Sequence, residues 1–161
     1  MSIYSLSHLP DSVVLRGLAS LVTRDRATTA ELLAHIAEAD ARRLYAPAGY
    51  PSMHSYCIHE LHLSEEAAFK RIHAARTARQ FPAIFAAVAD GRLHLSAVVM
   101  LAPHLTPENA DELLAAAAQL TKAELEQILA RCFLRPDLPE RVEPIPSAPS
   151  PALPTAPLAP G

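Results

Sequence analysis

Apolar residues recur every three or four positions along most of the chain, which is the spacing of amphipathic helices. The first such run follows Asp11 and consists of Val14, Leu15, Leu18, Leu21 and Val22. This period predicts a first helix that starts after Asp11. A polar stretch then separates this run from the next one.

A second helix is expected from Thr28 to about Leu44. Thr28 and Glu31 have the spacing of a capping box, in which each side chain accepts a bond from the other residue's backbone amide. The apolar stripe of this helix also carries Asp40. Because an unpaired carboxylate is costly to bury, Asp40 is expected to form an ion pair with a basic side chain from another helix. Prolines and a glycine between residues 47 and 51 then end the helical pattern.

Six further helices are predicted where polar caps, prolines and glycines bracket short apolar runs. They cover residues 52–61, 64–79, 82–90 with Gly91 as the C-terminal cap, 96–102, a segment starting at Thr106 and Pro107, and 121–133 with a capping box of Thr121 and Glu124. Abundant alanine and leucine with only four glycines favour packed helices over sheets. We therefore expect an all-α fold, a compact bundle of seven or eight helices formed by residues 1–134.

The composition changes at residue 135. Nine of the fifteen prolines lie between Pro136 and Pro160, interleaved with Ala, Ser and Leu. Such a segment is expected to form neither a helix nor a core. We predict a disordered, Pro-rich linker or tail over residues 135–161.

Charge, cysteines and hydropathy narrow the class of protein. A net charge of −3 argues against a uniformly basic nucleic-acid binder, so any DNA contact is expected to be local. The two cysteines are far apart in sequence and fit no disulfide framework, which indicates a reducing compartment. No apolar run reaches the roughly 18 residues needed to span a bilayer, and the N-terminus lacks signal-peptide features. We expect a cytoplasmic protein with no membrane partner.

Residues 60–79 combine the end of a short helix, a tight corner and a longer helix that opens at Ser64. The longer helix carries four basic residues and no acid after Phe69. These are the ingredients of a DNA-binding helix-turn-helix, and equally of any helical hairpin. Phe69 is expected to face the core, and Arg76 shares its sector. Arg76 is therefore expected to form a structural ion pair with Asp40.

The other three basic residues of this helix are the candidates for DNA contact. Lys70 and Arg71 are expected to face solvent, where they can contact phosphates. Arg79 is the third candidate, although Glu38 offers it an alternative structural partner.

A dense group of possible metal ligands precedes this hairpin. His54, Cys57, His59 and His62 fall within nine residues, and imidazole and thiolate are donors that zinc prefers. On a helix, however, His54 and Cys57 are expected to point to the core, whereas His59 turns away. We therefore expect a packed cysteine with surface histidines. The sequence predicts no metal site, no cofactor and no catalytic residue.

Four segments resemble a known family. They are LLAHIAEADARRLY at 32–45, the run from Ser55 to Ile84, the run from Asp90 to Ala117, and LTKAELEQILA at 120–130. Together they resemble the helical N-terminal region of bacterial HNH endonuclease-like proteins, in which a Pro-rich linker leads to a nuclease module. No HNH-type His-Asn-His arrangement follows here. The resemblance implies the non-catalytic part: a truncated copy, a gene fragment or a free-standing regulator.

Two functions are consistent with these features. The first is a non-catalytic module that associates with double-stranded DNA through the helix at 64–79. The second is a protein-interaction or dimerisation module without direct DNA contact. It would use the Pro-rich tail and the acidic late helices, which carry Glu108, Asp111, Glu112, Glu124 and Glu126. An active nuclease is the least favoured alternative.

Overall fold

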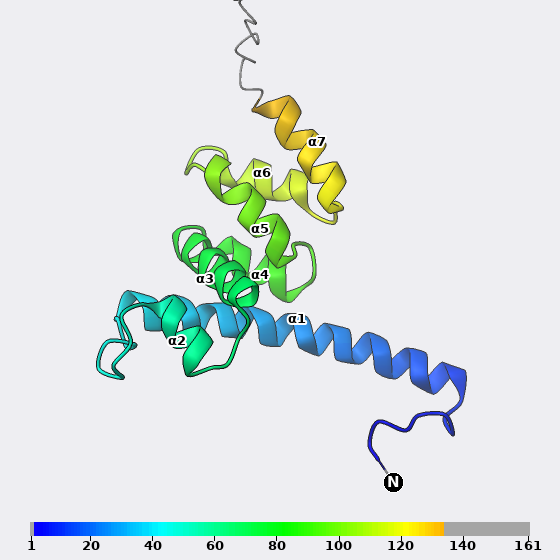
Figure 1. The fold of residues 1–161 in the computed structure, drawn as a ribbon. Coiled ribbons are helices and arrows are strands. Elements are labelled where there is room, and N and C mark those ends of the chain that lie inside the picture. The colour runs from blue at the N-terminus through cyan, green and yellow to red at the C-terminus, as the bar shows by residue number, and fades with distance from the viewer. Residues whose placement is uncertain (1, 134–161) are drawn as a thin grey trace, which may run out of the picture.

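The computed structural model describes residues 2–133, and the Pro-rich segment predicted from residue 135 lies outside this range. The described chain is helical and contains no strand, which confirms the predicted all-α fold (Figure 1). The elements are α1 (Asp11–Ala41), α2 (Met53–His59), α3 (Glu65–Gln80), α4 (Ala83–Ala89), α5 (Leu95–Leu101), a 3-10 turn η1 (Ala102–His104), α6 (Ala110–Ala117) and α7 (Lys122–Cys132). None of these helices combines the length and apolar character needed to cross a bilayer.

The first two predicted helices are one helix, α1, of 31 residues. The predicted break and the Thr28–Glu31 capping box are therefore wrong. A capping residue needs a non-helical backbone, and no Gly or Pro between residues 18 and 46 interrupts the helical hydrogen bonds. The helix ends at Ala41, three residues before the predicted end, and Arg43 then takes a left-handed conformation with φ +53°.

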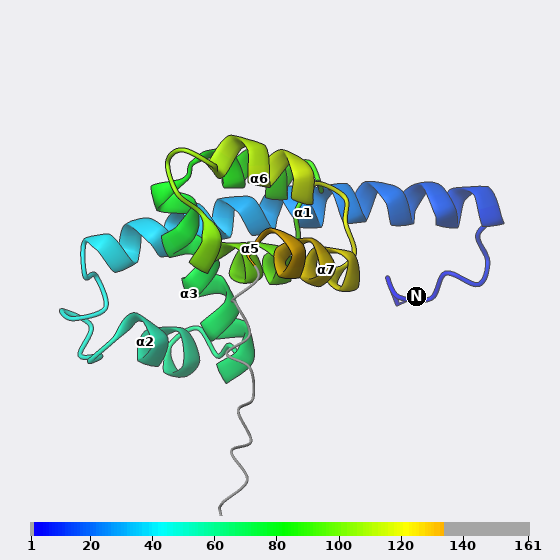
Figure 2. The same ribbon diagram turned by 90° about the horizontal axis from the view of Figure 1, so that it is seen from above.

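Helix α3 occupies the centre of the fold and packs against α1, α2, α4 and α5. Figures 1 and 2 show it crossing over the C-terminal half of α1, with α5 on its other side. Its buried positions are mostly alanines, and Ala68, Ala74, Ala75 and Ala78 have no exposed surface. Small side chains let neighbouring helices approach closely on several sides. Larger residues from the surrounding helices complete the core, including Leu33, Ile36, Ile84, Val88, Val98 and Leu101.

The late helices follow from local signals. Thr121 and Glu124 form the predicted capping box at the start of α7, which buries Leu125 and Leu129. Helix α6 begins at Ala110, later than predicted. Thr106 and Asn109 instead close a turn with reciprocal hydrogen bonds between their side chains and backbone amides.

Gly91 occupies the C-terminal capping position of α4, as predicted. Its φ of +81° lies in the left-handed region, which suits glycine. A Cβ at this position would come within 2.6 Å of Nη1 of Arg26. The guanidinium of Arg26 therefore lies over the turn because glycine leaves room for it.

The tight packing of α3 predicts a stability effect. Ala75→Leu is expected to destabilise the protein by about 1–3 kcal/mol, because added methylenes strain a filled core. Urea denaturation measures this free energy of unfolding. Ala86→Leu, an equal change on the exposed face of α4, is the matched control and is expected to have little effect. Equal stability of the two variants would contradict close packing at Ala75.

Candidate functional site

Asp40 and Arg76 form an ion pair that joins the end of α1 to α3. The guanidinium donates two hydrogen bonds, from Nε to Oδ2 at 2.7 Å and from Nη2 to Oδ1 at 3.0 Å. The carboxylate side chain is 16% exposed and the arginine side chain 60%. The bonds from Arg76 lower the pKa of Asp40 below its ordinary value, and partial burial opposes this shift. Paired bonds of this kind fix geometry as well as charge.

A second ion pair lies beside the first. Arg79 donates from Nη1 to Oε2 of Glu38 at 2.9 Å, and Arg42 donates to the other oxygen of the same carboxylate. These bonds, with that of Arg79 the largest influence, lower the pKa of Glu38. Arg79 was a candidate for DNA contact, and in the structure it is engaged with α1.

The remaining two DNA-contact candidates are also engaged. Lys70 donates to Glu66 at 2.7 Å, one turn earlier on α3. Arg71 is half-buried, and its Nη1 lies 3.5 Å from the carbonyl oxygen of Ala67. Its Nε is buried and has no hydrogen-bond partner in residues 2–133. Arg71, expected to face solvent, is thus only partly exposed and borders a depression shared with α1 and the α4–α5 turn.

The predicted inward face of α3 is also partly wrong. Phe69, expected to face the core, is 56% exposed, whereas the polar residue Thr77 is buried. The spacing of apolar residues in the sequence predicts a helix that is buried on one side only. Because four helices contact α3, its buried sector is broader than the apolar stripe, and it is filled by alanines.

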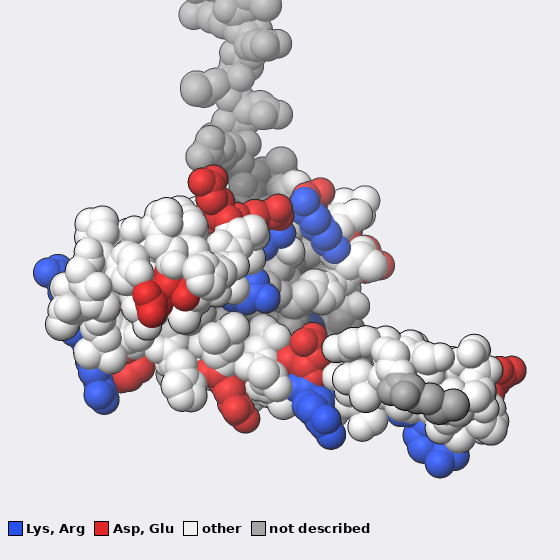
Figure 3. Space-filling model, turned by 60° about the horizontal axis from the view of Figure 1, so that its bottom comes forward, with Lys and Arg blue, Asp and Glu red and all other residues white. Residues whose placement is uncertain are grey.

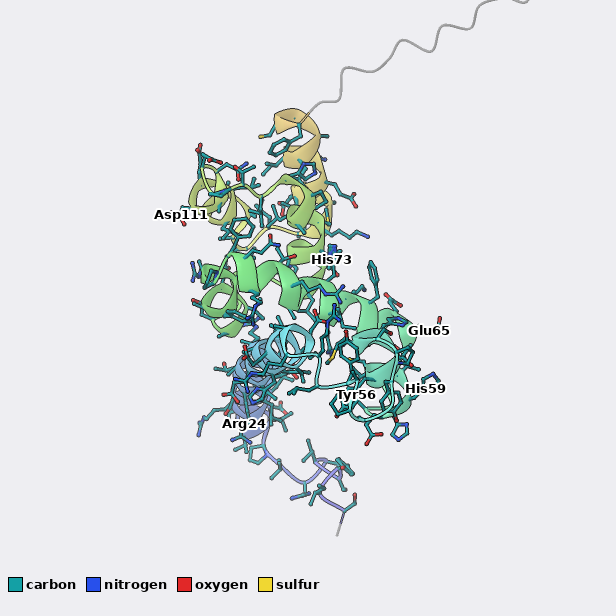
Figure 4. All side chains as sticks on the ribbon, turned by 90° about the vertical axis from the view of Figure 1, so that its left-hand side faces the viewer. Arg24, Tyr56, His59, Glu65, His73 and Asp111 are labelled. Atoms are coloured by element: carbon teal, nitrogen blue, oxygen red, sulfur yellow. The ribbon has the colours of Figure 1, made fainter. Side chains whose placement is uncertain are left out.

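The histidine and cysteine cluster does not converge. Cys57 is fully buried, and burial raises the pKa of its thiol, which disfavours the reactive thiolate. His54 is exposed, so the prediction that it points to the core is wrong. Figure 4 places His59 and Glu65 at the α2–α3 corner and His73 further along α3. Among residues 2–133, no three His, Cys, Asp or Glu side chains gather as metal ligands.

Acidic and basic side chains are interspersed on one face of the protein. Figure 3 shows Lys and Arg scattered among Asp and Glu on the face it displays, without a continuous basic patch. Of the acidic residues on the late helices, Glu108, Asp111 and Glu112 are exposed, whereas Glu124 closes its own helix cap. Neither sign of charge dominates the face that Figure 3 displays.

The N-terminal half of α1 is uncovered. It projects beyond the other helices in Figures 1 and 2. Leu15 is 65% exposed and Leu18 57%, and Val13, Leu21 and Val22 are exposed as well. We call Leu15, Leu18, Leu21 and Val22 the α1 stripe. The sequence period placed these residues on one face of a helix, but it contained no sign that the face lacks a covering element.

Comparisons with protein-family models, curated proteins and solved structures find no match to this chain. The resemblance to the HNH endonuclease-like N-terminal region stays a prediction.

The ion pair predicts an acid dependence of stability. Because the pKa of Asp40 is lowered on folding, its contribution is complete above pH ~4 and is lost as the pH falls through the folded pKa. Asp40→Asn is expected to cost about 1 kcal/mol at pH 7 and to flatten the loss of stability in acid. Denaturant titrations between pH 7 and pH 2.5 measure both effects.

The matched control is Glu66→Gln, which removes an exposed pair within one helix. Its change in stability is expected to be much smaller. If the two variants lose stability equally at pH 7, the Asp40–Arg76 pair is no more than a surface contact.

Proposed function

We propose that this chain is a non-catalytic protein-association module and that its partner is a second copy of itself. The observation that supports this proposal is the uncovered α1 stripe. Contiguous apolar surface bordered by polar residues is typical of protein interaction sites. The rest of α1 is buried against α3 and α4, so only its N-terminal half offers such a surface.

The stripe continues a face that is already a packing face. Leu15 and Leu33 are eighteen residues apart, which is five turns at ~3.6 residues per turn, so they lie on the same side of α1. Leu18 and Ile36 have the same relation. Leu33 and Ile36 are buried in the core. One face of α1 is thus covered by helices along its second half, and a helix from another molecule would cover the first half in the same way.

The spacing of the stripe suits a second copy in antiparallel orientation. A two-fold axis near Leu18 sets Leu15 of each copy opposite Val22 of the other. Leu18 then lies close to its own equivalent at the centre of the contact. A symmetric dimer needs such a self-complementary surface.

Association with DNA through α3 stays a prediction, and the geometry gives it less support. Three of the four basic residues on α3 are paired with carboxylates, and Arg71 is half-buried. Phosphate contacts would require these pairs to open. The net charge of −3 offers no general attraction for a polyanion.

Self-association predicts a concentration-dependent dimer. Leu18→Glu is expected to raise the dimer dissociation constant at least about tenfold, because it buries a charge at the centre of the interface. Sedimentation equilibrium measures this constant, and circular dichroism confirms that the helix content is kept. Leu44→Glu is the matched control, since Leu44 is also exposed but lies beyond the end of α1. A parent protein that stays monomeric at millimolar concentration would refute the proposal.

Disulfide crosslinking tests the antiparallel register of the proposed dimer. In a Cys132→Ser background, which removes the exposed native thiol, Leu15→Cys combined with Val22→Cys is expected to form an intermolecular disulfide. Leu15→Cys alone is expected to crosslink poorly, because antiparallel copies hold this position several residues from its equivalent. Efficient crosslinking of the single variant would indicate a parallel dimer instead.

The DNA alternative predicts a different result. If α3 contacts phosphates, the parent binds duplex DNA with an affinity that falls steeply with added salt. Lys70→Ala combined with Arg71→Ala then weakens binding, as measured by fluorescence anisotropy at low and moderate salt. Because the geometry favours self-association, we expect no salt-sensitive binding by the parent.

A further inference from the structure

A cavity of about 690 Å³ opens between α2, α3 and η1, away from the α1 stripe. This volume is in the range of sites that bind small organic molecules. The polar residues of its lining are Ser52, His54, His73, Arg76, Thr77 and Gln80. No Asp or Glu is among these residues.

The wall of the cavity is apolar and partly aromatic. Phe69 borders it from α3, and Pro103 borders it from η1. The ring of Phe69 meets that of His73 edge-on, with centroids 5.7 Å apart and planes at 68°. More than half of the phenylalanine surface is nevertheless exposed. A flat apolar group in the cavity would cover aromatic surface that the fold leaves open.

Three residues of the lining, Arg76, His54 and His73, carry hydrogen-bond donors. Arg76 uses Nε and Nη2 for Asp40, which fixes the plane of the guanidinium. In the described residues no acceptor is bonded to its Nη1. The imidazole rings of His54 and His73 line the same cavity, and neither makes a hydrogen bond within residues 2–133. An arginine held in place by a carboxylate is a pre-positioned donor for an anion.

We propose that this cavity binds a small organic anion with a flat, apolar body. The body lies against Phe69 and Pro103, and the anionic group accepts hydrogen bonds from Nη1 of Arg76 and from His54 or His73. The Asp40–Arg76 pair is then both a tie between helices and the orienting element of a binding site. This site is separate from the dimer surface proposed above.

The probe for this site is 1-naphthoate, with the uncharged 1-naphthalenemethanol as its isosteric comparison. Nitrogen-15 NMR titration of the full chain is expected to show saturable shifts at residues 69–77 and around Ala102. The neutral compound is expected to bind at least about tenfold more weakly. Equal binding of both compounds, or shifts centred on another part of the protein, would overturn the proposal.

Two variants test the location. Ala102→Trp places an indole ring inside the cavity and is expected to weaken naphthoate binding at least about tenfold, whereas Ala86→Trp, the matched control on exposed α4, is expected to leave it unchanged. If Ala102→Trp does not fold, Phe69→Ala replaces it, because Phe69 is exposed and contributes little to the core. Unchanged binding in a folded cavity variant would refute the site. Leu18→Glu is expected to leave naphthoate affinity unchanged, which separates this test from that of dimerisation.

Discussion

The close approach of α3 to its neighbours is the constraint on which the rest of the structure depends. Four alanines on this helix have no exposed surface, and each allows a neighbouring backbone to come near. Larger residues at these positions would push the surrounding helices apart. In Figure 1, α1 lies on one side of α3 and α5 to α7 lie on the other. This arrangement depends on the small side chains of the central helix α3.

The charges of α3 follow from the same position. A helix surrounded by others has little free surface, so its long basic side chains reach to the rim and meet the acids there. Arg76 and Arg79 both extend to the last turns of α1, where Asp40 and Glu38 accept their bonds. Two of the four basic residues that suggest a recognition helix in the sequence therefore tie α3 to the end of α1. The same pairing holds Arg76 at the edge of a cavity.

Local chemistry explains which features were predictable from the sequence. The caps at Ser64, Thr121 and Gly91 were predicted correctly because the residues before and after each one already end or start a helix. A partner for Asp40 was expected because a carboxylate on an apolar stripe requires one. The helix start at Thr28 was predicted wrongly because a Thr and a Glu three residues apart occur inside helices as well as at their starts. Phe69 was predicted wrongly because nothing in the sequence shows that α2 and η1 leave a cavity beside it. Arg71 is half-buried because several helices surround α3, and their number is a tertiary property.

The length of α1 has a consequence for its own order. Its second half is held by the core, but the first four turns have only their backbone bonds and their neighbours along the helix to stabilise them. A free helix of that length is marginal in water, and Gly17 in its middle weakens it by about 1 kcal/mol relative to alanine. Amide protons there should exchange with solvent far faster than those around Leu33. A partner that covers this arm would therefore also stabilise its helical conformation.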